Sequence, residues 1–162
     1  MNTTDSAKVS DANAGANNVV HSPHNPTLTG LATLTRNVAY ETGADNLVMD
    51  IISPQSTGDD DDRRYPTGVF GQGSAWTTPH RDYEIPQLSA LAREGFVVAT
   101  VNHRDASSDP RDVFPAYLED VKAAIRYLRA NARQWHVDPD HLGIWGTSSG
   151  GNTSLLVEVT AD

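Results

Sequence analysis

Short apolar runs alternate with longer amphipathic stretches from about residue 34 onward. Runs of strand length, rich in Val, Ile and other apolar residues, occupy 38–40, 47–52, 67–72, 96–102 and 141–146. Such runs are typical of β-strands when turn-forming residues bound them. The first two flank the turn-like sequence Thr42-Gly43-Ala44-Asp45, which predicts a β-hairpin.

Helical periodicity separates the later strands. In the longest helical stretch, apolar residues share one face at spacings of three and four, at Leu118, Val121, Ile125, Leu128 and Ala132. Pro115 suits the first turn of this helix. An earlier helix is expected to begin near Pro86 and to stop at Gly95, and a third covers 152–157. Because strands and helices alternate, the pattern predicts right-handed βαβ units and a mostly parallel sheet.

The N-terminal part has a different composition. Residues 1–30 are rich in Asn, Thr, Ser, Ala and Asp and contain little to bury. We therefore expect a flexible polar tail, followed by one domain over 31–162. The acidic run Asp59–Asp62 offers oxygen ligands of the kind that hard cations prefer. Four adjacent carboxylates cannot all face one ion, so we interpret this run as a solvated loop and expect no metal site.

Composition narrows the classes of function. A formal charge of -9 and a pI near 4.9 disfavour binding to nucleic acid, which requires clustered Lys and Arg. The absence of cysteine excludes disulfides, thiolate zinc sites and a cysteine nucleophile. The sequence has no signal-peptide pattern and no stretch near the roughly 20 apolar residues of a membrane span. We expect a soluble protein, cytoplasmic by default.

The residues that point to chemistry are Gly146-Thr147-Ser148-Ser149-Gly150-Gly151. They directly follow the apolar run 141–145 and directly precede the helical stretch 152–157. A serine at such a strand-to-helix turn adopts strained backbone angles, and the flanking glycines let neighbouring backbone approach without a Cβ clash. The pattern predicts that the Ser148 hydroxyl stands exposed above the sheet, beside an unpaired backbone N–H at the helix start.

Several motifs together resemble one family of enzymes. The segment Gln72-Gly73-Ser74-Ala75-Trp76 is similar to the H-G-G-G-W loop of hormone-sensitive-lipase-like and feruloyl-esterase-like carboxylesterases. Further matches, in the family's order, are Val101-Asn102-His103-Arg104, Phe114-Pro115-Ala116, Asp120-Val121-Lys122-Ala123-Ala124 and residues 138–146. The resemblance implies the α/β-hydrolase fold, an α/β three-layer sandwich with a mostly parallel sheet, and a hydrolase acting on carboxylic esters.

The resemblance also implies a role for the serine motif. Ser148 would be the catalytic nucleophile that forms an acyl-enzyme, and Gly146 and Gly150 would be the elbow glycines. Trp76 would line the substrate pocket. The partner implied is a small-molecule ester, and the mechanism requires no metal ion and no organic cofactor.

The oxyanion hole implied by the resemblance consists of backbone N–H groups. These belong to Gly73 and Ser74 in the earlier loop and to Ser149 after the nucleophile. The loop departs from the family's pattern, because Gln72 replaces the usual His and Ser74 and Ala75 replace glycines. Backbone donation remains possible with these side chains, and Gly73 is the more conventional donor of the two.

The catalytic triad is incomplete. In this fold a carboxylate and then a histidine follow the serine along the chain. After Ser148 the sequence offers only Glu158 and Asp162 as carboxylates and no histidine. His80 or His103 would replace the base only if it reached the hydroxyl. The family's sheet also continues further, so we expect a partial domain whose C-terminal strands are missing and which self-associates through an open sheet edge.

Two other interpretations of the sequence are a protein kinase and a protein without catalytic activity. The triplet His103-Arg104-Asp105 is similar to the catalytic triplet of protein kinases, but position 110 is Pro and no D-F-G follows, which disfavours a kinase. The serious alternative is a catalytically inactive hydrolase-like remnant, or a binding module without a complete triad. Among the tryptophans, Trp145 is predicted to pack in the core, because its strand would be central.

Overall fold

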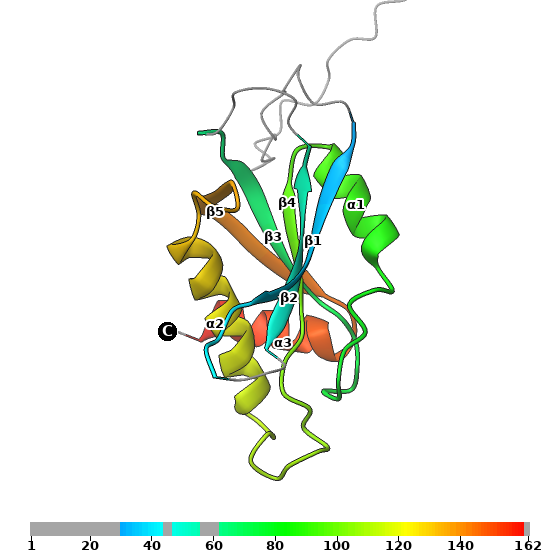
Figure 1. The fold of residues 1–162 in the computed structure, drawn as a ribbon. Helices are drawn as coiled ribbons and strands as arrows, with labels where there is room; N and C mark the ends of the chain where they lie inside the picture. The colour runs from blue at the N-terminus through cyan, green and yellow to red at the C-terminus, as the bar shows by residue number, and fades with distance from the viewer. Residues whose placement is uncertain (1–29, 44–46, 56–61, 161–162) are drawn as a thin grey trace, which may run out of the picture.

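Five strands form one sheet in the computed structural model, which describes residues 30–43, 47–55 and 62–160 (Figure 1). The strands are β1 (Ala32–Ala39), β2 (Val48–Pro54), β3 (Tyr65–Gly71), β4 (Val97–Val101) and β5 (Val137–Gly146). Their order is β1-β2-β4-β3-β5. The pairs β1–β2 and β2–β4 are antiparallel, and β3 pairs in parallel with both β4 and β5, so the described sheet is mixed rather than mostly parallel as the sequence predicts. The predicted hairpin is confirmed, whereas the expected N-terminal tail and most of the acidic run lie outside the described residues.

Three helices cover the two faces of the sheet. They are α1 (Ile85–Arg93), α2 (Ala116–Ala130) and α3 (Ser149–Val159). α1 packs against β2 and β4 on one face, whereas α2 and α3 contact each other and β5 on the other. Successive strand residues point to opposite faces, so Val97 joins the core under α2 and Val98 the core under α1. This arrangement confirms the three-layer α/β sandwich. None of these helices is long and apolar enough to cross a membrane.

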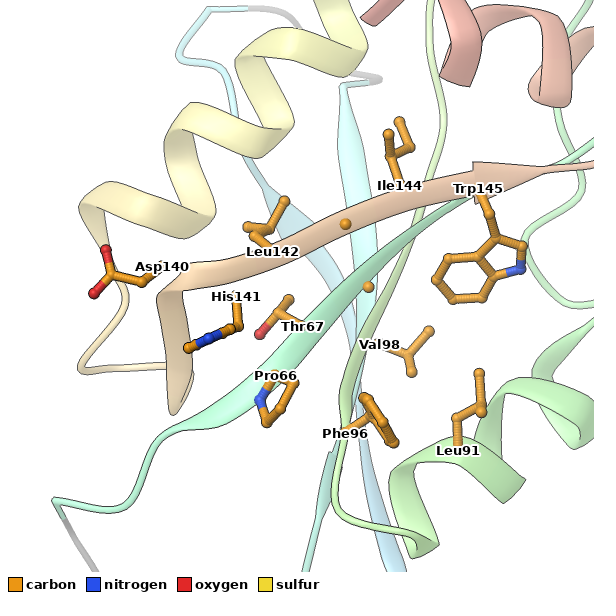
Figure 2. A pocket seen from close by; sticks show the side chains of 12 residues that line it. Pro66, Thr67, Leu91, Phe96, Val98, Asp140, His141, Leu142, Ile144 and Trp145 are labelled. Carbon is orange, nitrogen blue, oxygen red and sulfur yellow. The ribbon is translucent and has the colours of Figure 1, made fainter. Parts of the chain in front are cut away.

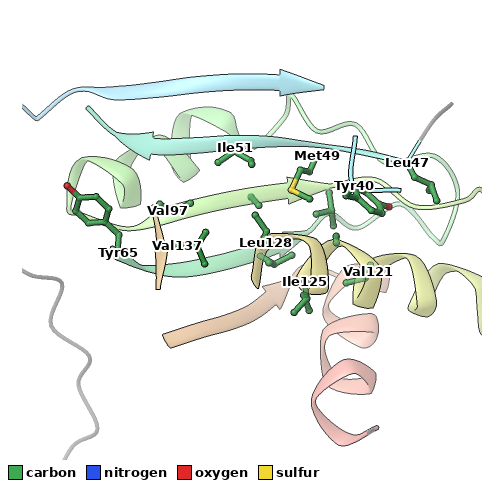
Figure 3. Close-up of a cluster of buried hydrophobic side chains, with 14 residues drawn as sticks. Tyr40, Leu47, Met49, Ile51, Tyr65, Val97, Val121, Ile125, Leu128 and Val137 are labelled. Carbon is green, nitrogen blue, oxygen red and sulfur yellow. The ribbon is translucent and has the colours of Figure 1, made fainter. Parts of the chain in front are cut away.

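The larger core joins the sheet to α2. Met49 and Ile51 of β2 and Val97 of β4 meet Ile125 and Leu128 of α2 (Figure 3). Each such side chain contributes about 1.5–3 kcal/mol when it is fully buried. All five residues of β4 are buried. A strand that is buried on both faces has a continuous apolar sequence rather than an alternating one, which explains the pattern at 96–102.

The helix ends follow the predicted signals. Pro86 lies in the first turn of α1, and Gly95, with φ of +94°, follows its C-terminal end. Only a residue that tolerates the left-handed region fits there without strain. α2 begins directly after Pro115, as predicted, but it ends two residues before Ala132. Ala132 was expected on the helical stripe and instead packs against the larger core from the following turn.

β5 starts earlier than the sequence indicates. The sequence predicts a strand over 141–146, whereas β5 already begins at Val137. Its register against β3 shifts there, since Tyr65 pairs with Val137 and Thr67 pairs with Leu142. Extra residues in one strand form a bulge, which accommodates Pro139 because proline has no N–H to donate to the ladder.

The prediction that Trp145 packs in the core is wrong. Among the described strands β5 pairs only with β3, and Trp145 is 36% exposed. Its ring tilts against Phe70, with 5.4 Å between the ring centroids. No strand in the described ranges covers the other side of β5, and this is why an apolar side chain of that strand meets solvent.

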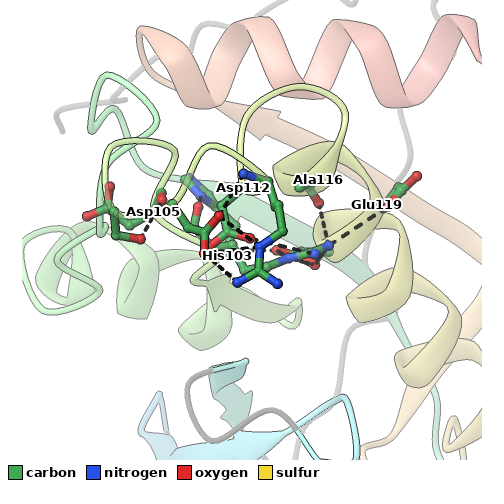
Figure 4. Close-up of polar contacts among 10 residues, drawn as sticks. His103, Asp105, Asp112, Ala116 and Glu119 are labelled. Carbon is green, nitrogen blue, oxygen red and sulfur yellow. Dashed lines mark hydrogen bonds and ion pairs between the residues drawn. The ribbon is translucent and has the colours of Figure 1, made fainter.

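An ion pair connects the end of β4 to α2. The carboxylate of Asp120 is almost fully buried. It accepts hydrogen bonds from the backbone N–H of Arg104 at 2.8 Å, from its Nη2 at 2.7 Å and from its Nε at 3.0 Å. Arg104 Nη2 also donates to the Ala116 carbonyl at 3.2 Å (Figure 4). The hydrogen bonds raise the pKa of the Arg104 guanidinium, which stays charged.

We expect Asp120→Ala to destabilise the protein by about 1.5–3 kcal/mol, the usual loss for hydrogen bonds to a charged group. The loss stays in this range because Arg104 is 39% exposed and water can solvate it. Urea unfolding followed by fluorescence measures the change. Glu119→Ala is the matched control, since its carboxylate lies 3.9 Å from Arg104 Nη2 and is 64% exposed. An equal loss in both variants would contradict this account.

Candidate active site

Ser148 lies at the junction of β5 and α3. Its backbone angles are φ 49° and ψ −122°. Non-glycine residues rarely occupy such a region, and holding one there costs about 1–3 kcal/mol. Ser148 is exposed, and its hydroxyl forms no hydrogen bond with the residues that the structure describes. The backbone therefore has the strained, solvent-facing turn that the G-x-S-x-G motif predicts.

The two glycines of this motif are sterically required. A Cβ on Gly150 would lie 2.0 Å from the carbonyl oxygen of Gly71, and one on Gly146 would lie 2.4 Å from the same atom. Both distances are far below van der Waals contact. α3 can thus begin directly against the end of β3 only because neither position has a side chain.

The loop after β3 touches the serine turn, as the sequence predicts. A Cβ on Gly73 would lie 2.8 Å from the Cβ of Ser148. The N–H of Gly73 donates to Thr147 Oγ1 at 3.0 Å, and the N–H of Ser74 donates to Ser149 Oγ at 2.9 Å. Both expected oxyanion donors therefore lie at the elbow, each bonded to a hydroxyl of a neighbouring residue. The sequence does not reveal these two hydroxyl acceptors.

The N–H of Ser149 is also placed for the predicted role. Ser149 is the first residue of α3. The first N–H groups of a helix have no carbonyl partner within the helix and carry the positive end of its dipole. A developing negative charge beside Ser148 would be stabilised at this end of α3.

A tight turn follows the two loop amides. Ala75 and Trp76 have φ of 52° and 61°, in the left-handed region. The Thr77 N–H donates to the Ser74 carbonyl at 3.0 Å. The Ser74 hydroxyl donates to the Thr77 carbonyl at 2.7 Å, and the Thr77 hydroxyl donates to the Ser74 carbonyl at 2.6 Å. We call residues 74–77 the loop turn.

Gln72, which replaces the family's histidine, closes the same loop. Its side chain is buried, and its Oε1 accepts a hydrogen bond from the backbone N–H of His80. The two ends of the loop that includes Gly73 are therefore joined through one side-chain amide. This contact gives the replacement a structural role in the loop.

Trp76 lies in a group of aromatic side chains. Its ring centroid is 5.9 Å from that of Tyr117, which also lies 6.0 Å from the His103 ring and 6.1 Å from the Phe114 ring. The Nε1 of Trp76 is buried and has no hydrogen-bond partner among the residues that the structure describes. The predicted contact of Trp76 with substrate remains a prediction.

Neither histidine near the loop is bonded to the serine. His80 stacks on Tyr83, with 5.0 Å between the ring centroids. His103 Nδ1 lies 2.7 Å from the carbonyl oxygen of Arg104. Within the described part of the chain, neither ring hydrogen-bonds to Ser148. The structure thus brings the serine and the proposed oxyanion donors together, but it offers no general base bonded to the hydroxyl. It also shows no group of three His, Asp or Glu residues suited to a metal ion among those same residues.

A buried carboxylate links the loop region to the hairpin. Asp50 of β2 is fully buried, and its Oδ1 accepts from Arg81 Nη1 at 2.5 Å and from the Asn37 N–H at 2.8 Å. Arg81 Nη2 also donates to Asn37 Oδ1 at 2.8 Å. Arg36 lies 3.6 Å from the other oxygen of Asp50. The available sequence signal was a single charged residue inside the apolar run 47–52.

An apolar groove lies beside β5, away from the serine turn. Its volume is 470 Å³, and Figure 2 shows its lining from α1, β4 and β5. The apolar side chains include Leu91, Phe96, Val98 and Trp145. Leu91 and Trp145 are partly exposed. This groove is the uncovered apolar flank that the sequence predicts beside the last strand.

Comparison with known proteins agrees with this fold. Residues 49–162 match the BD-FAE family. The probable carboxylic ester hydrolase LipM of Mycobacterium tuberculosis is 36% identical over 89 residues, which are 54% of this chain and 20% of LipM. A truncated carbohydrate esterase from gut microbiota is 33% identical, with a TM-score of 0.60 over 82% of this chain and 44% of that one. Esterase B from Lactobacillus rhamnosis shares the fold, with a TM-score of 0.65 and 24% identity over 78% of this chain and 38% of its own.

These matches cover a larger share of this chain than of the proteins it resembles. This chain spans 20% of LipM and less than half of either solved structure. The family match, in contrast, extends over more than half of this chain and includes the loop and the serine turn. The matched proteins are named as esterases or carboxylic ester hydrolases, and the solved structure of the truncated carbohydrate esterase shares the fold of this chain. The chain therefore belongs to the BD-FAE family of the α/β-hydrolase fold.

Proposed function

We propose that this chain supplies the nucleophile half of a carboxylic ester hydrolase that forms an acyl-enzyme on Ser148. The observation that carries the proposal is the exposed, strained Ser148 at a strand-to-helix turn, in contact with Gly73. The esterase relatives support the reaction class. Small-molecule esters are the proposed substrates.

The mechanism follows from the positions of the backbone donors. The Ser148 oxygen attacks the ester carbonyl while its proton passes to a general base, and the carbonyl oxygen becomes negatively charged. The N–H of Ser149, with those of Gly73 and Ser74, would stabilise this charge after the two loop amides exchange their hydroxyl acceptors for the oxyanion. The ester C–O bond then breaks, the alcohol leaves with the proton, and water releases the acid from Ser148.

We further propose that the general base and its carboxylate partner belong to a continuation of this polypeptide. Two observations support this: the apolar groove beside β5 is uncovered, and the relatives match over only a fraction of their length. Without such a continuation, the exposed edge of β5 would favour self-association. We call the protein read from the gene past Asp162 the full-length protein.

Covalent labelling with a fluorophosphonate probe tests the proposal, because the probe reacts with activated serines. We expect the full-length protein to be labelled at Ser148 and the chain ending at Asp162 to be labelled at least about 100-fold more slowly, since it lacks the base. Peptide mapping identifies the modified residue. A folded full-length protein that remains unlabelled, or that is labelled elsewhere, would favour the inactive remnant or binding module.

A further inference from the structure

Asp105 bridges two loops at the carboxyl edge of the sheet. It lies in the loop after β4 (Figure 4), and each of its carboxylate oxygens accepts two hydrogen bonds. Oδ2 accepts from the backbone N–H of Thr78 at 3.1 Å and from its hydroxyl at 2.9 Å. Oδ1 accepts from the N–H and hydroxyl of Ser107, at 2.8 and 2.5 Å. The Ala106 N–H also donates to the Trp76 carbonyl at 2.9 Å.

These contacts hold the far end of the loop turn. Its near end is attached to the serine elbow through the amides of Gly73 and Ser74. Its centre consists of two non-glycine residues in the left-handed region, Ala75 and Trp76, where a Cβ makes the backbone conformation unfavourable. Such strain persists only where surrounding contacts determine the conformation. Thr78 follows the loop turn directly, so its hydrogen bonds to Asp105 fix the position at which the chain leaves the turn.

The carboxylate of Asp105 is ionised at neutral pH. The hydrogen bonds from Ser107, and then those from Thr78, lower the pKa of Asp105 to about 2. Both carboxylate oxygens of Asp105 can therefore accept hydrogen bonds at neutral pH. This accounts for the Asp of the triplet His103-Arg104-Asp105, which the proposed reaction otherwise leaves without a role.

We propose that Asp105 is a positioning residue for acyl transfer, because its hold on Thr78 keeps the loop turn in place and with it the amides of Gly73 and Ser74 beside Ser148. This inference rests on the proposed function. Asp105 touches none of the reacting atoms. Its effect is therefore expected on stabilisation of the transition state rather than on binding of the ester.

The test compares four variants of the full-length protein with p-nitrophenyl acetate. We expect Asp105→Ala to lower kcat about 10–100-fold with KM changed less than about threefold, because misplaced oxyanion donors weaken the transition state. Asp105→Asn retains one acceptor oxygen and is expected to lose less. Thr78→Val is expected to lower kcat about 3–10-fold, by removing one bond to Asp105. Asp109→Ala is the control, since its carboxylate pairs with Arg111 in the same loop.

A second readout separates positioning from general damage. A trifluoromethyl ketone adds to the serine and places its oxygen in the oxyanion site, so its Ki is expected to weaken by the same factor as kcat/KM. The double variant, which combines Asp105→Ala with Thr78→Val, is expected to have the same kcat as Asp105→Ala alone, because both substitutions remove the same contact. Thermal unfolding confirms that each variant is folded.

The outcomes distinguish this inference from the function on which it rests. An unaltered full-length protein with neither activity nor labelling at Ser148 would overturn both. An active protein whose folded Asp105→Ala variant keeps its kcat and its Ki would overturn only the positioning role. A rise in KM at constant kcat, or equal losses in Asp105→Ala and Asp109→Ala, would also overturn it.

Discussion

Replacing Ser148 with alanine is expected to remove nearly all esterase activity of the full-length protein, lowering kcat by roughly 10⁴–10⁶-fold. The variant loses the proposed covalent route, because the neighbouring hydroxyls of Thr147 and Ser149 already accept hydrogen bonds from the loop amides. The backbone donors remain, so a small rate above that in water is expected to persist. Steady-state hydrolysis of p-nitrophenyl acetate measures the loss, and mass spectrometry detects the acyl adduct in the unaltered protein.

A serine elsewhere in the fold provides the control. Ser89 lies on α1, where its hydroxyl donates to the Ile85 carbonyl at 2.7 Å. Ser89→Ala is expected to keep kcat within about twofold, because this helix covers the other face of the sheet. Retention of activity in Ser148→Ala, with an acyl adduct on another residue, would refute the assignment of the nucleophile.

Replacing Gly150 with alanine is expected to destabilise the fold by about 3 kcal/mol or more. The new methyl group would lie 2.0 Å from the carbonyl oxygen and 2.4 Å from the carbonyl carbon of Gly71. Both contacts are with backbone at the end of β3, where Gly71 pairs with Val101 and Gly146, and this backbone cannot rotate away as a side chain can. α3 must therefore move off β3, and Ser148 moves with it.

Urea unfolding of the chain ending at Asp162, in which β5 keeps the exposed edge described here, measures this loss, with Gly143→Ala as the matched control. Gly143 also lies next to the elbow, in β5, but a Cβ there meets no atom within 4 Å. The control is expected to stay within about 0.5 kcal/mol of the unaltered protein. Similar stabilities for the two variants would show that the contact between Gly71 and Gly150 is looser than described.

Local sequence patterns predicted most of the elements. The hairpin, the ends of α1, the start of α2 and the serine turn each depend on a few consecutive residues whose backbone preferences are strong, such as Pro86, Gly95 and Gly150. Such preferences act over only a few neighbouring residues, so they can be recognised from the sequence alone. The loop that contains Gly73 was proposed as part of the oxyanion hole because it resembles a loop of a known family. The spacing of its residues alone is not specific.

The errors came from contacts between distant parts of the chain. Trp145 looks like a core residue in sequence, but the position of β5 in the sheet leaves it partly exposed. The bulge that accommodates Pro139 depends on the register with β3. The bond between Ser74 and Ser149 joins residues 75 positions apart, and the bond between Thr78 and Asp105 joins residues 27 positions apart.

The bonds of Asp50 have a practical consequence for shortening the protein. Arg81, in the segment that leads from the loop containing Gly73 into α1, donates hydrogen bonds to Asp50 and to Asn37 of the N-terminal hairpin. Removing β1 would leave Asp50 buried with fewer donors and would release Arg81 from one of its two partners. An expression boundary chosen for crystallisation therefore has to keep everything from Leu31 onward, although this edge of the sheet is farthest from the strand that leads to Ser148.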